Sequence, residues 1–132
     1  MTATVHKVLL HSSYGYLLLS AVLHFFVDVL QQYWRGERPP GAESTYYYGL
    51  HTAYSLGQVA FAVLALIVIG TGSDFLSGFL GQLLSIALVA AWFVLCLVFF
   101  EYFPPKLHLM IVSVLLVAAA VTSFASRTSA GA

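Results

Sequence analysis

Hydrophobic residues fill four long stretches of the chain, which short polar segments separate. The stretches cover about residues 8–30, 48–70, 80–101 and 107–124. A helix needs about 20 residues to cross a hydrocarbon core of roughly 30 Å. The stretches also lack the ten-residue alternation of a membrane β-strand, and a helix satisfies its own backbone hydrogen bonds inside lipid. The pattern therefore predicts an all-α fold, an integral membrane four-helix bundle.

The segments between the stretches are short and rich in residues that stop helices. Residues 35–45 contain two glycines, two prolines and several charges, residues 71–74 read Thr-Gly-Ser-Asp, and two prolines follow the third stretch at positions 104–105. Such segments are typical of turns between helices. None is long enough to hold another folding unit, so we expect a single four-helix transmembrane domain over residues 1–132.

The composition agrees with a chain that faces lipid over most of its surface. Hydrophobic residues make up 61% of the sequence and charged residues 8%, whereas a soluble domain carries about a quarter charged residues. Membrane lipids are therefore predicted partners. The formal net charge of zero provides no basic face, so we predict no nucleic-acid partner.

The two membrane faces differ in aromatic and basic residues. The ends joined by the first and third loops carry an aromatic belt: Tyr33, Trp34, Tyr46, Tyr47, Tyr48, Tyr102 and Phe103. Those loops hold Arg35, Arg38 and Lys106, against Lys7 and Arg127 on the other side. A multi-pass protein with the first and third loops in the cytoplasm is weakly favoured by this difference.

Polar residues of all four spans converge on the side of the first and third loops. On the first span they recur in steps of three or four: Ser13, Tyr16, Ser20, His24, Asp28 and Gln31. The second span repeats this spacing with Tyr47, His51, Tyr54 and Gln58, Glu101 closes the third, and His108 opens the fourth. Because such steps place residues on one face of a helix, we expect these groups to line a common pocket.

Asp28 is the most informative of these residues. It lies six residues inside Trp34, so roughly 9 Å below the interface, and His24 is roughly 15 Å deep. A carboxylate at such depth costs about 2.5–3.5 kcal/mol, so it should face the bundle interior or a wet cavity. Two interpretations remain open: Asp28 and His24 act on a ligand, or they tie helices together by hydrogen bonds.

The first interpretation predicts a pocket for a lipophilic small molecule of sterol, isoprenoid or amphiphile type. If the protein is an enzyme, an acid/base isomerase or cyclase is expected, because acids and a base share the pocket. The predicted catalytic residues are Asp28, His24 and Glu101. The predicted ligand contacts are Gln58, Tyr54, His51, His108 and Trp92.

Several kinds of chemistry have no motif in this chain. There is no CxxC pair, HExxH sequence, phosphate-binding loop or zinc-type spacing of cysteines and histidines, and Cys96 is the single cysteine. We therefore predict no metal site and no cofactor.

Three fragments resemble the EXPERA family, the group of the sigma-2 receptor and the emopamil-binding protein. They are the acidic stretch 25–31 of the first span, the stretch 53–61 with its glutamine, and the acidic aromatic end of the third span at 98–103. The resemblance implies a four-helix membrane fold that binds sterols or amphiphiles in a cavity and isomerises a sterol in some members. Residue by residue, the family's functional positions match only Asp28, Gln58 and Glu101 of this chain.

The chain also departs from that family. The family has a glutamate one turn before the glutamine, where this chain has Tyr54, and its first loop is longer than the present one. The missing glutamate weighs against isomerase chemistry more than against ligand binding.

Two other functions fit the same residues. A small oligomeric transporter or channel, coupled to protons through Asp28, would use the small residues at 53–57 and 118–120 for close helix contacts, as in a homodimer. The small residues at 77, 81 and 85 predict a further close helix approach. A haem-b or quinone-binding redox subunit would use His24, His51 and His108, since bundle histidines commonly ligate haem.

Overall fold

The computed structural model describes the backbone of residues 2–130 and the side chains of residues 4–125. The chain order is α1 (Thr2–His24), the π-helix η1 (Phe25–Gln31), α2 (Gln32–Arg35), α3 (Ala42–Gly70), α4 (Phe79–Phe99) and α5 (Pro104–Ala130). The described residues contain no strand. The prediction of an all-α fold is confirmed.

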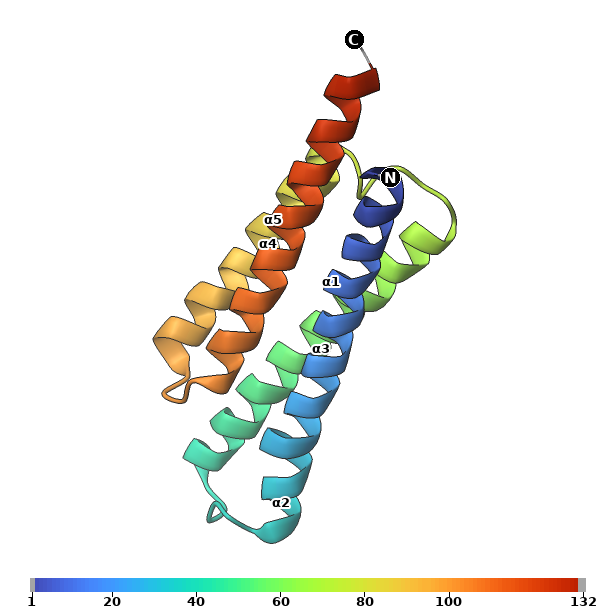
Figure 1. Cartoon of the computed structure of the whole chain (residues 1–132). Coiled ribbons are helices and arrows are strands. Elements are labelled where there is room, and N and C mark those ends of the chain that lie inside the picture. Colours follow the sequence, from blue (N-terminus) through green and yellow to red (C-terminus); the bar gives the residue numbers. More distant parts are fainter. Residues whose placement is uncertain (1, 131–132) are drawn as a thin grey trace.

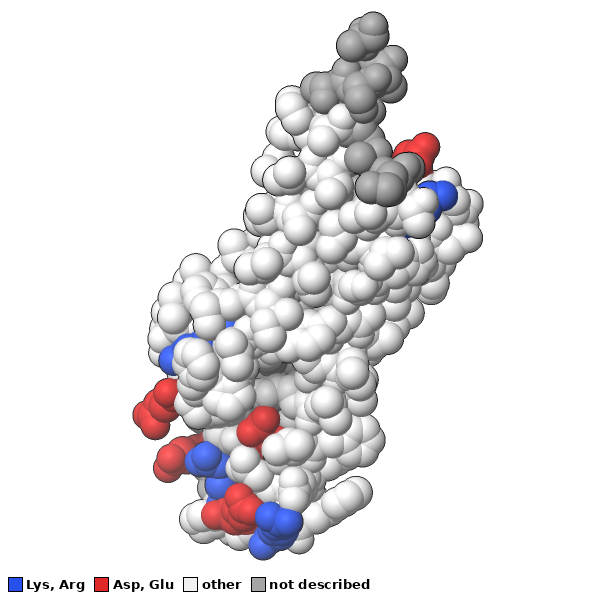
Figure 2. Space-filling view, in the orientation of Figure 1, with Lys and Arg blue, Asp and Glu red and all other residues white. Residues whose placement is uncertain are grey.

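Four segments are long and apolar enough to cross a membrane. They are Thr4–Arg35, Ala42–Gly70, Phe79–Phe99 and Pro104–Ala125. On the face drawn in Figure 2, charged side chains gather toward the two ends and leave an uncharged band between them. The structure thus supports a multi-pass integral membrane protein built as a four-helix bundle.

The helices begin and end differently from the hydropathy pattern. The first continues through η1 to Arg35, five residues beyond the predicted end. The second begins at Ala42 instead of Tyr48, because the amide of Gly41 donates to Ser44 Oγ at 3.1 Å and that hydroxyl donates back to the Gly41 carbonyl at 2.9 Å. This reciprocal pair satisfies groups that a helix start leaves free.

The third and fourth helices meet at a tight turn. α4 ends at Phe99, so Glu101 lies in the turn and does not close the helix as the sequence predicted. Pro104 and Pro105 then open α5, as expected for a residue whose fixed φ suits a first helical turn.

Two helical hairpins make up the bundle (Figure 1). α1 packs against both α3 and α5, while α4 packs against α5. The chain termini lie at one end, and α2 lies at the other. At the α2 end, the α1–α3 hairpin extends beyond the α4–α5 turn.

The interior between the hairpins is tightly packed along most of its length. Leu17, Leu109 and Val112 are completely buried. Within this apolar core the Tyr14 hydroxyl bonds Ser85 Oγ at 2.7 Å, so α1 and α4 are tied together by a satisfied polar pair. Large apolar side chains such as Leu84 and Val98 are exposed on the outside of α4, where lipid would cover them.

The lengths of the helices place the α4–α5 turn close to a membrane boundary. α4 has 21 residues, about 31 Å at 1.5 Å per residue, which just spans the hydrocarbon core. His24 packs against Tyr102 of this turn, with ring centroids 6.4 Å apart. The polar cluster around His24 therefore lies nearer the boundary than the rise from Trp34 predicts.

Candidate functional site

A contact between a histidine and a carboxylate within the first helix anchors the site. His24 Nδ1 lies 2.9 Å from Asp28 Oδ2, and the two side chains are 6% and 15% exposed. Asp28 belongs to η1, where the wider π-helical turn interrupts the regular α-helix directly after His24. Such interruptions occur frequently at functional sites. The prediction that Asp28 faces inward next to His24 is met by this geometry.

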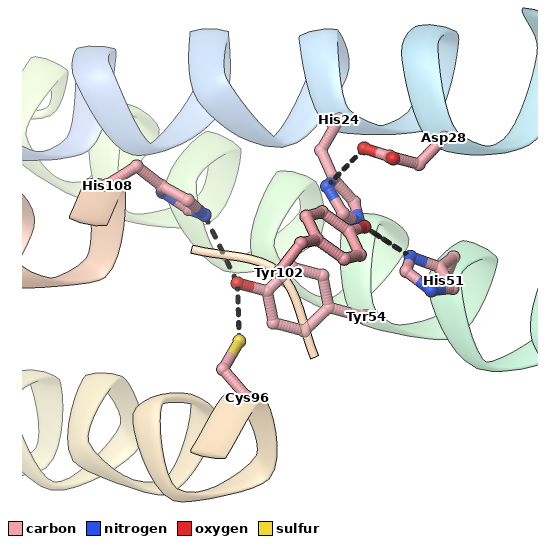
Figure 3. A network of polar contacts seen from close by, with 7 residues as sticks. All are labelled: His24, Asp28, His51, Tyr54, Cys96, Tyr102 and His108. Carbon is pink, nitrogen blue, oxygen red and sulfur yellow. Dashed lines mark hydrogen bonds and ion pairs between the residues drawn. The ribbon is translucent and has the colours of Figure 1, made fainter. Parts of the chain in front are cut away.

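A second histidine continues the pair across to α3 (Figure 3). His24 Nε2 lies 3.0 Å from Nδ1 of His51, and the two rings meet almost edge to edge, with centroids 5.1 Å apart and planes 24° apart. The Tyr102 hydroxyl also reaches His51 Nδ1 at 3.2 Å. Asp28, His24 and His51 therefore form one hydrogen-bonded row.

Aromatic rings hold His51 in this position. Phe100 stacks on it with centroids 4.4 Å apart and planes 6° apart, and Tyr47 packs against it at 4.1 Å. The guanidinium carbon of Arg38 lies 3.5 Å from the centre of the Tyr47 ring, a cation–π contact. A cation thus lies one ring away from His51.

A second polar network lies beside the first. The Tyr54 hydroxyl bonds His108 Nε2 at 3.1 Å and accepts the thiol hydrogen of Cys96 at 3.2 Å, so it links α3, α4 and α5 (Figure 3). His24 contacts the Tyr54 ring with centroids 5.1 Å apart, which joins the two networks. Nδ1 of His108 is buried and has no hydrogen-bond partner among the described residues.

Gln58 is fully buried one turn further into the bundle. Its amide makes no hydrogen bond of normal geometry within the described part of the chain, although it lies near enough to interact with the Tyr54 hydroxyl. The neighbouring Ser55 hydroxyl is equally buried and unpaired there. Unpaired buried polar groups cost about 1–3 kcal/mol each, so these positions are not explained by packing alone.

Two hollows flank the His24–Asp28 pair. An end cavity of about 570 Å³ opens toward the loops, and a side cavity of about 240 Å³ lies between α1 and the start of α5. The end cavity is lined by polar and aromatic residues that include Asp28, Gln32, Arg38, Tyr47, His51, Glu101 and Tyr102. The side cavity is mainly apolar, with Leu23, Val27 and two prolines beside His24, Asp28 and His108. Asp28 lines both.

No protein-family model, curated protein or solved structure matches the chain. The resemblance to the EXPERA family therefore stays a prediction. Within the described residues no three histidine, cysteine or acidic side chains come together as a metal site.

The structure brings most of the predicted residues together. Asp28, His24, His51, Tyr54 and His108 belong to the joined networks. Glu101 is exposed but lines the end cavity, and Gln58 lies deeper.

Trp92 lies apart from the networks. It packs on Phe61 with ring centroids 5.7 Å apart, and a Cβ placed on Gly57 would lie 3.7 Å from the Trp92 ring. Trp92 is not among the residues that line the end cavity, and its role as a ligand contact stays a prediction.

Three contributors to the site were not predicted. The sequence places Arg38 in the basic loop, Tyr102 in the aromatic belt, and both Tyr102 and Phe100 in the stretch that resembles the EXPERA family, but it does not mark any of the three as a site residue. A useful signal was available for Tyr102. Phe103 directly precedes two prolines and is disfavoured in a helix, so Tyr102 next to it is expected in a turn that can fold back over the helix ends.

Tyr102 provides a test of how closed the site is at high pH. Burial raises the pKa of its hydroxyl above the ordinary 10.0. The raised pKa in the folded state means that Tyr102 adds stability below about pH 10, and that this stability is lost as the pH rises further. We expect the absorbance difference between wild type and Tyr102→Phe to show no phenolate until the pH is well above 10. A phenolate that forms near pH 10 would show that Tyr102 is solvated.

Proposed function

We propose that this membrane protein binds a lipophilic small molecule with a polar head, and that the head occupies the end cavity between the first and third loops. The observation that carries the proposal is the arrangement around Asp28, a half-buried carboxylate shared by a polar cavity and an apolar one. A sterol-like, isoprenoid or other amphiphilic molecule has this division of polar and apolar parts.

The size and lining of the end cavity support the proposal. Ligand pockets are usually about 300–1,000 Å³, with aromatic walls and a few polar groups that fix orientation. The cavity has 570 Å³, and its walls combine the rings of Tyr47, Phe100 and Tyr102 with charged groups. It lies at the helix ends, where a molecule could enter from the membrane boundary.

The position of polar groups that lack partners gives further support. Nδ1 of His108 is unpaired among the described residues, and His108 lines the side cavity. A ligand group at this place would satisfy a buried atom that the protein leaves open.

The haem alternative fits the geometry less well. Two metal–nitrogen bonds of about 2 Å on opposite sides of an iron would need roughly 4 Å between the imidazole nitrogens. The facing nitrogens of His24 and His51 are 3.0 Å apart, so the rings would have to separate. The transporter alternative, the homodimer and the membrane orientation stay predictions.

Lipid analysis of the purified protein tests the proposal. We expect mass spectrometry to find a lipophilic species enriched with the wild type and depleted severalfold in Asp28→Asn and in Leu50→Trp, because Leu50 lines the end cavity and a larger side chain would fill it. His11→Gln is the control, since His11 is exposed and, among the described residues, bonds only the Lys7 carbonyl at 2.8 Å. Identical lipid profiles in all four proteins would contradict the proposal.

A further inference from the structure

The hydrogen-bonded row of Asp28, His24 and His51 ends at the end cavity. Asp28 Oδ2 contacts His24 Nδ1, and His24 Nε2 contacts His51 Nδ1, so each of these four atoms is engaged. His51 lines the end cavity, and no group of the described residues bonds its Nε2. That nitrogen is therefore the end of the row that a ligand can reach.

The same cavity also has a cation in its wall, one aromatic ring away from His51. Arg38 lines the cavity and lies over Tyr47, which packs against His51. Its Nε is buried without a hydrogen-bond partner among the described residues, and no carboxylate among them forms an ion pair with Arg38. Arg35 differs, since its Nη1 lies 3.6 Å from Glu37 Oε1. A guanidinium with free donor capacity stabilises an oxyanion.

We infer that Asp28, His24 and His51 form a proton relay that deprotonates a lipophilic oxygen acid, of the phenol or enol class, bound in the end cavity next to Arg38. This inference rests on the proposed function. Since the ligand would lose only a proton, the step needs no oxidant and no cofactor.

The proton balance follows from the hydrogen bonds. Before the step, both imidazoles are neutral: His24 donates from Nδ1 to Asp28, and His51 donates from Nδ1 to His24 Nε2. The ligand hydroxyl gives its proton to His51 Nε2, and the Nδ1 proton of His51 moves to His24. His24 is then an imidazolium paired with the Asp28 carboxylate, and the ligand is an anion next to Arg38. The reverse sequence returns the proton to the ligand.

The charged and polar groups around His51 set its proton affinity. The titratable and charged groups that face His51 or share its cavity come from the first helix, the two loops and α3. They are Asp28, His24, Arg38, Glu43, Tyr47, Glu101 and Tyr102. Asp28 favours protonation of the relay, whereas Arg38 favours negative charge on the ligand. Proton transfer separates the charges so that each lies near an opposite one.

A coloured probe tests the relay directly. The probe is 4-dodecyl-2-nitrophenol, whose anion absorbs visible light, and its methyl ether is the matched molecule without a transferable proton. Protein in nanodiscs is compared with empty nanodiscs one pH unit below the pKa of the probe in the empty discs, where about a tenth of it is ionised. We expect the protein-bound probe to show at least a fivefold higher anion fraction, and the ether to compete for binding.

Variants separate binding from proton transfer. We expect His51→Gln to bind the probe within threefold of the wild type while the anion fraction returns to the level of empty discs. Arg38→Gln and Asp28→Asn should each lower the anion fraction at least twofold. The control His11→Gln should match the wild type.

Nitrogen NMR of the wild type keeps the test independent of whether the variants fold. In protein labelled with ¹⁵N-histidine, His51 Nε2 should change from an unprotonated to a protonated shift with the phenol and stay unchanged with the ether. Binding of both probes without a rise in the anion would overturn the relay and leave the proposed function intact. Binding of neither probe would overturn both.

Discussion

Gly81→Ala is expected to lower the stability of the folded protein by about 1–3 kcal/mol, the usual cost of forcing extra volume into a packed site. A Cβ at position 81 would lie 2.2 Å from the carbonyl oxygen of Phe75 and 2.9 Å from Cα of Leu76. Both atoms are backbone, so no side-chain rotation relieves the contact. The turn that precedes α4 would have to move away from the helix.

The same substitution at an open glycine provides the matched control. Gly49 lies inside α3, and no atom of the described residues outside its own helical turns is within 4 Å of the place that its Cβ would take. Gly49→Ala should leave stability unchanged or raise it by up to about 1 kcal/mol, because alanine favours helices more than glycine does. Thermal unfolding in one detergent, followed by circular dichroism, compares the two variants.

Equal melting temperatures for Gly81→Ala and the wild type would show that the turn before α4 does not press on the helix. The turn is held by backbone bonds from the amides of Ser77 and Gly78 to the Asp74 carbonyl, at 3.1 and 2.9 Å. Because these bonds fix its path, we expect the clash to unfold the turn or shift α4, and not to be absorbed.

The small residues around the start of α4 show what could and could not be predicted from the sequence. The spacing at positions 77, 81 and 85 predicted a close approach, and the structure has one at Gly81. The partner is the preceding turn instead of a neighbouring helix. Ser85 does meet a neighbouring helix, since its hydroxyl pairs with Tyr14 of α1 and donates to the Gly81 carbonyl. Residue size predicts that space is scarce but not which segment fills it.

The spans were predictable because the bilayer imposes one simple condition on length and polarity. A single carboxylate among apolar residues also predicted that Asp28 faces inward, since the alternative is costly. The pairing of His24 with His51 was not predictable in the same way. It depends on how far α3 slides along α1, and that offset is set by packing between two helices.

The contacts between the α4–α5 turn and His51 exist because α4 ends two residues earlier than the hydropathy pattern predicts. Hydropathy continued the third span to residue 101, but α4 ends at Phe99. The two residues released from the helix let Phe100 stack on His51 and bring Tyr102 next to it. Sequence patterns place helix ends only to within a few residues, so the contacts of Phe100 and Tyr102 with His51 could not be predicted.

His24→Leu is expected to destabilise the protein by about 2–3 kcal/mol. The substitution removes a hydrogen-bonded partner from Asp28, whose side chain is only 15% exposed, and from Nδ1 of His51. A charged group that loses its hydrogen bond in a buried place costs about this much. The cost stays below that of a fully buried pair because Asp28 lines two cavities that can admit water.

The double variant distinguishes a coupled pair from two separate polar residues. His24→Leu with Asp28→Leu removes the charge together with its partner, and replacing a buried pair by apolar groups is often neutral or stabilising. We expect the double variant to be more stable than His24→Leu alone, with a coupling energy of about 1–3 kcal/mol between the positions. Lys7→Leu with Tyr46→Leu is the control, since these exposed residues lie near opposite ends of the α1–α3 hairpin and should act additively.

The outcome of this cycle also bears on why the pair exists. A protein more stable with two leucines than with His24 and Asp28 would be keeping the pair at a cost, and a cost in stability is expected at a site selected for function. Strictly additive losses would instead show that the 2.9 Å contact contributes nothing. The two residues would then be independent polar groups, and both the shared pocket and the relay would lose their physical basis.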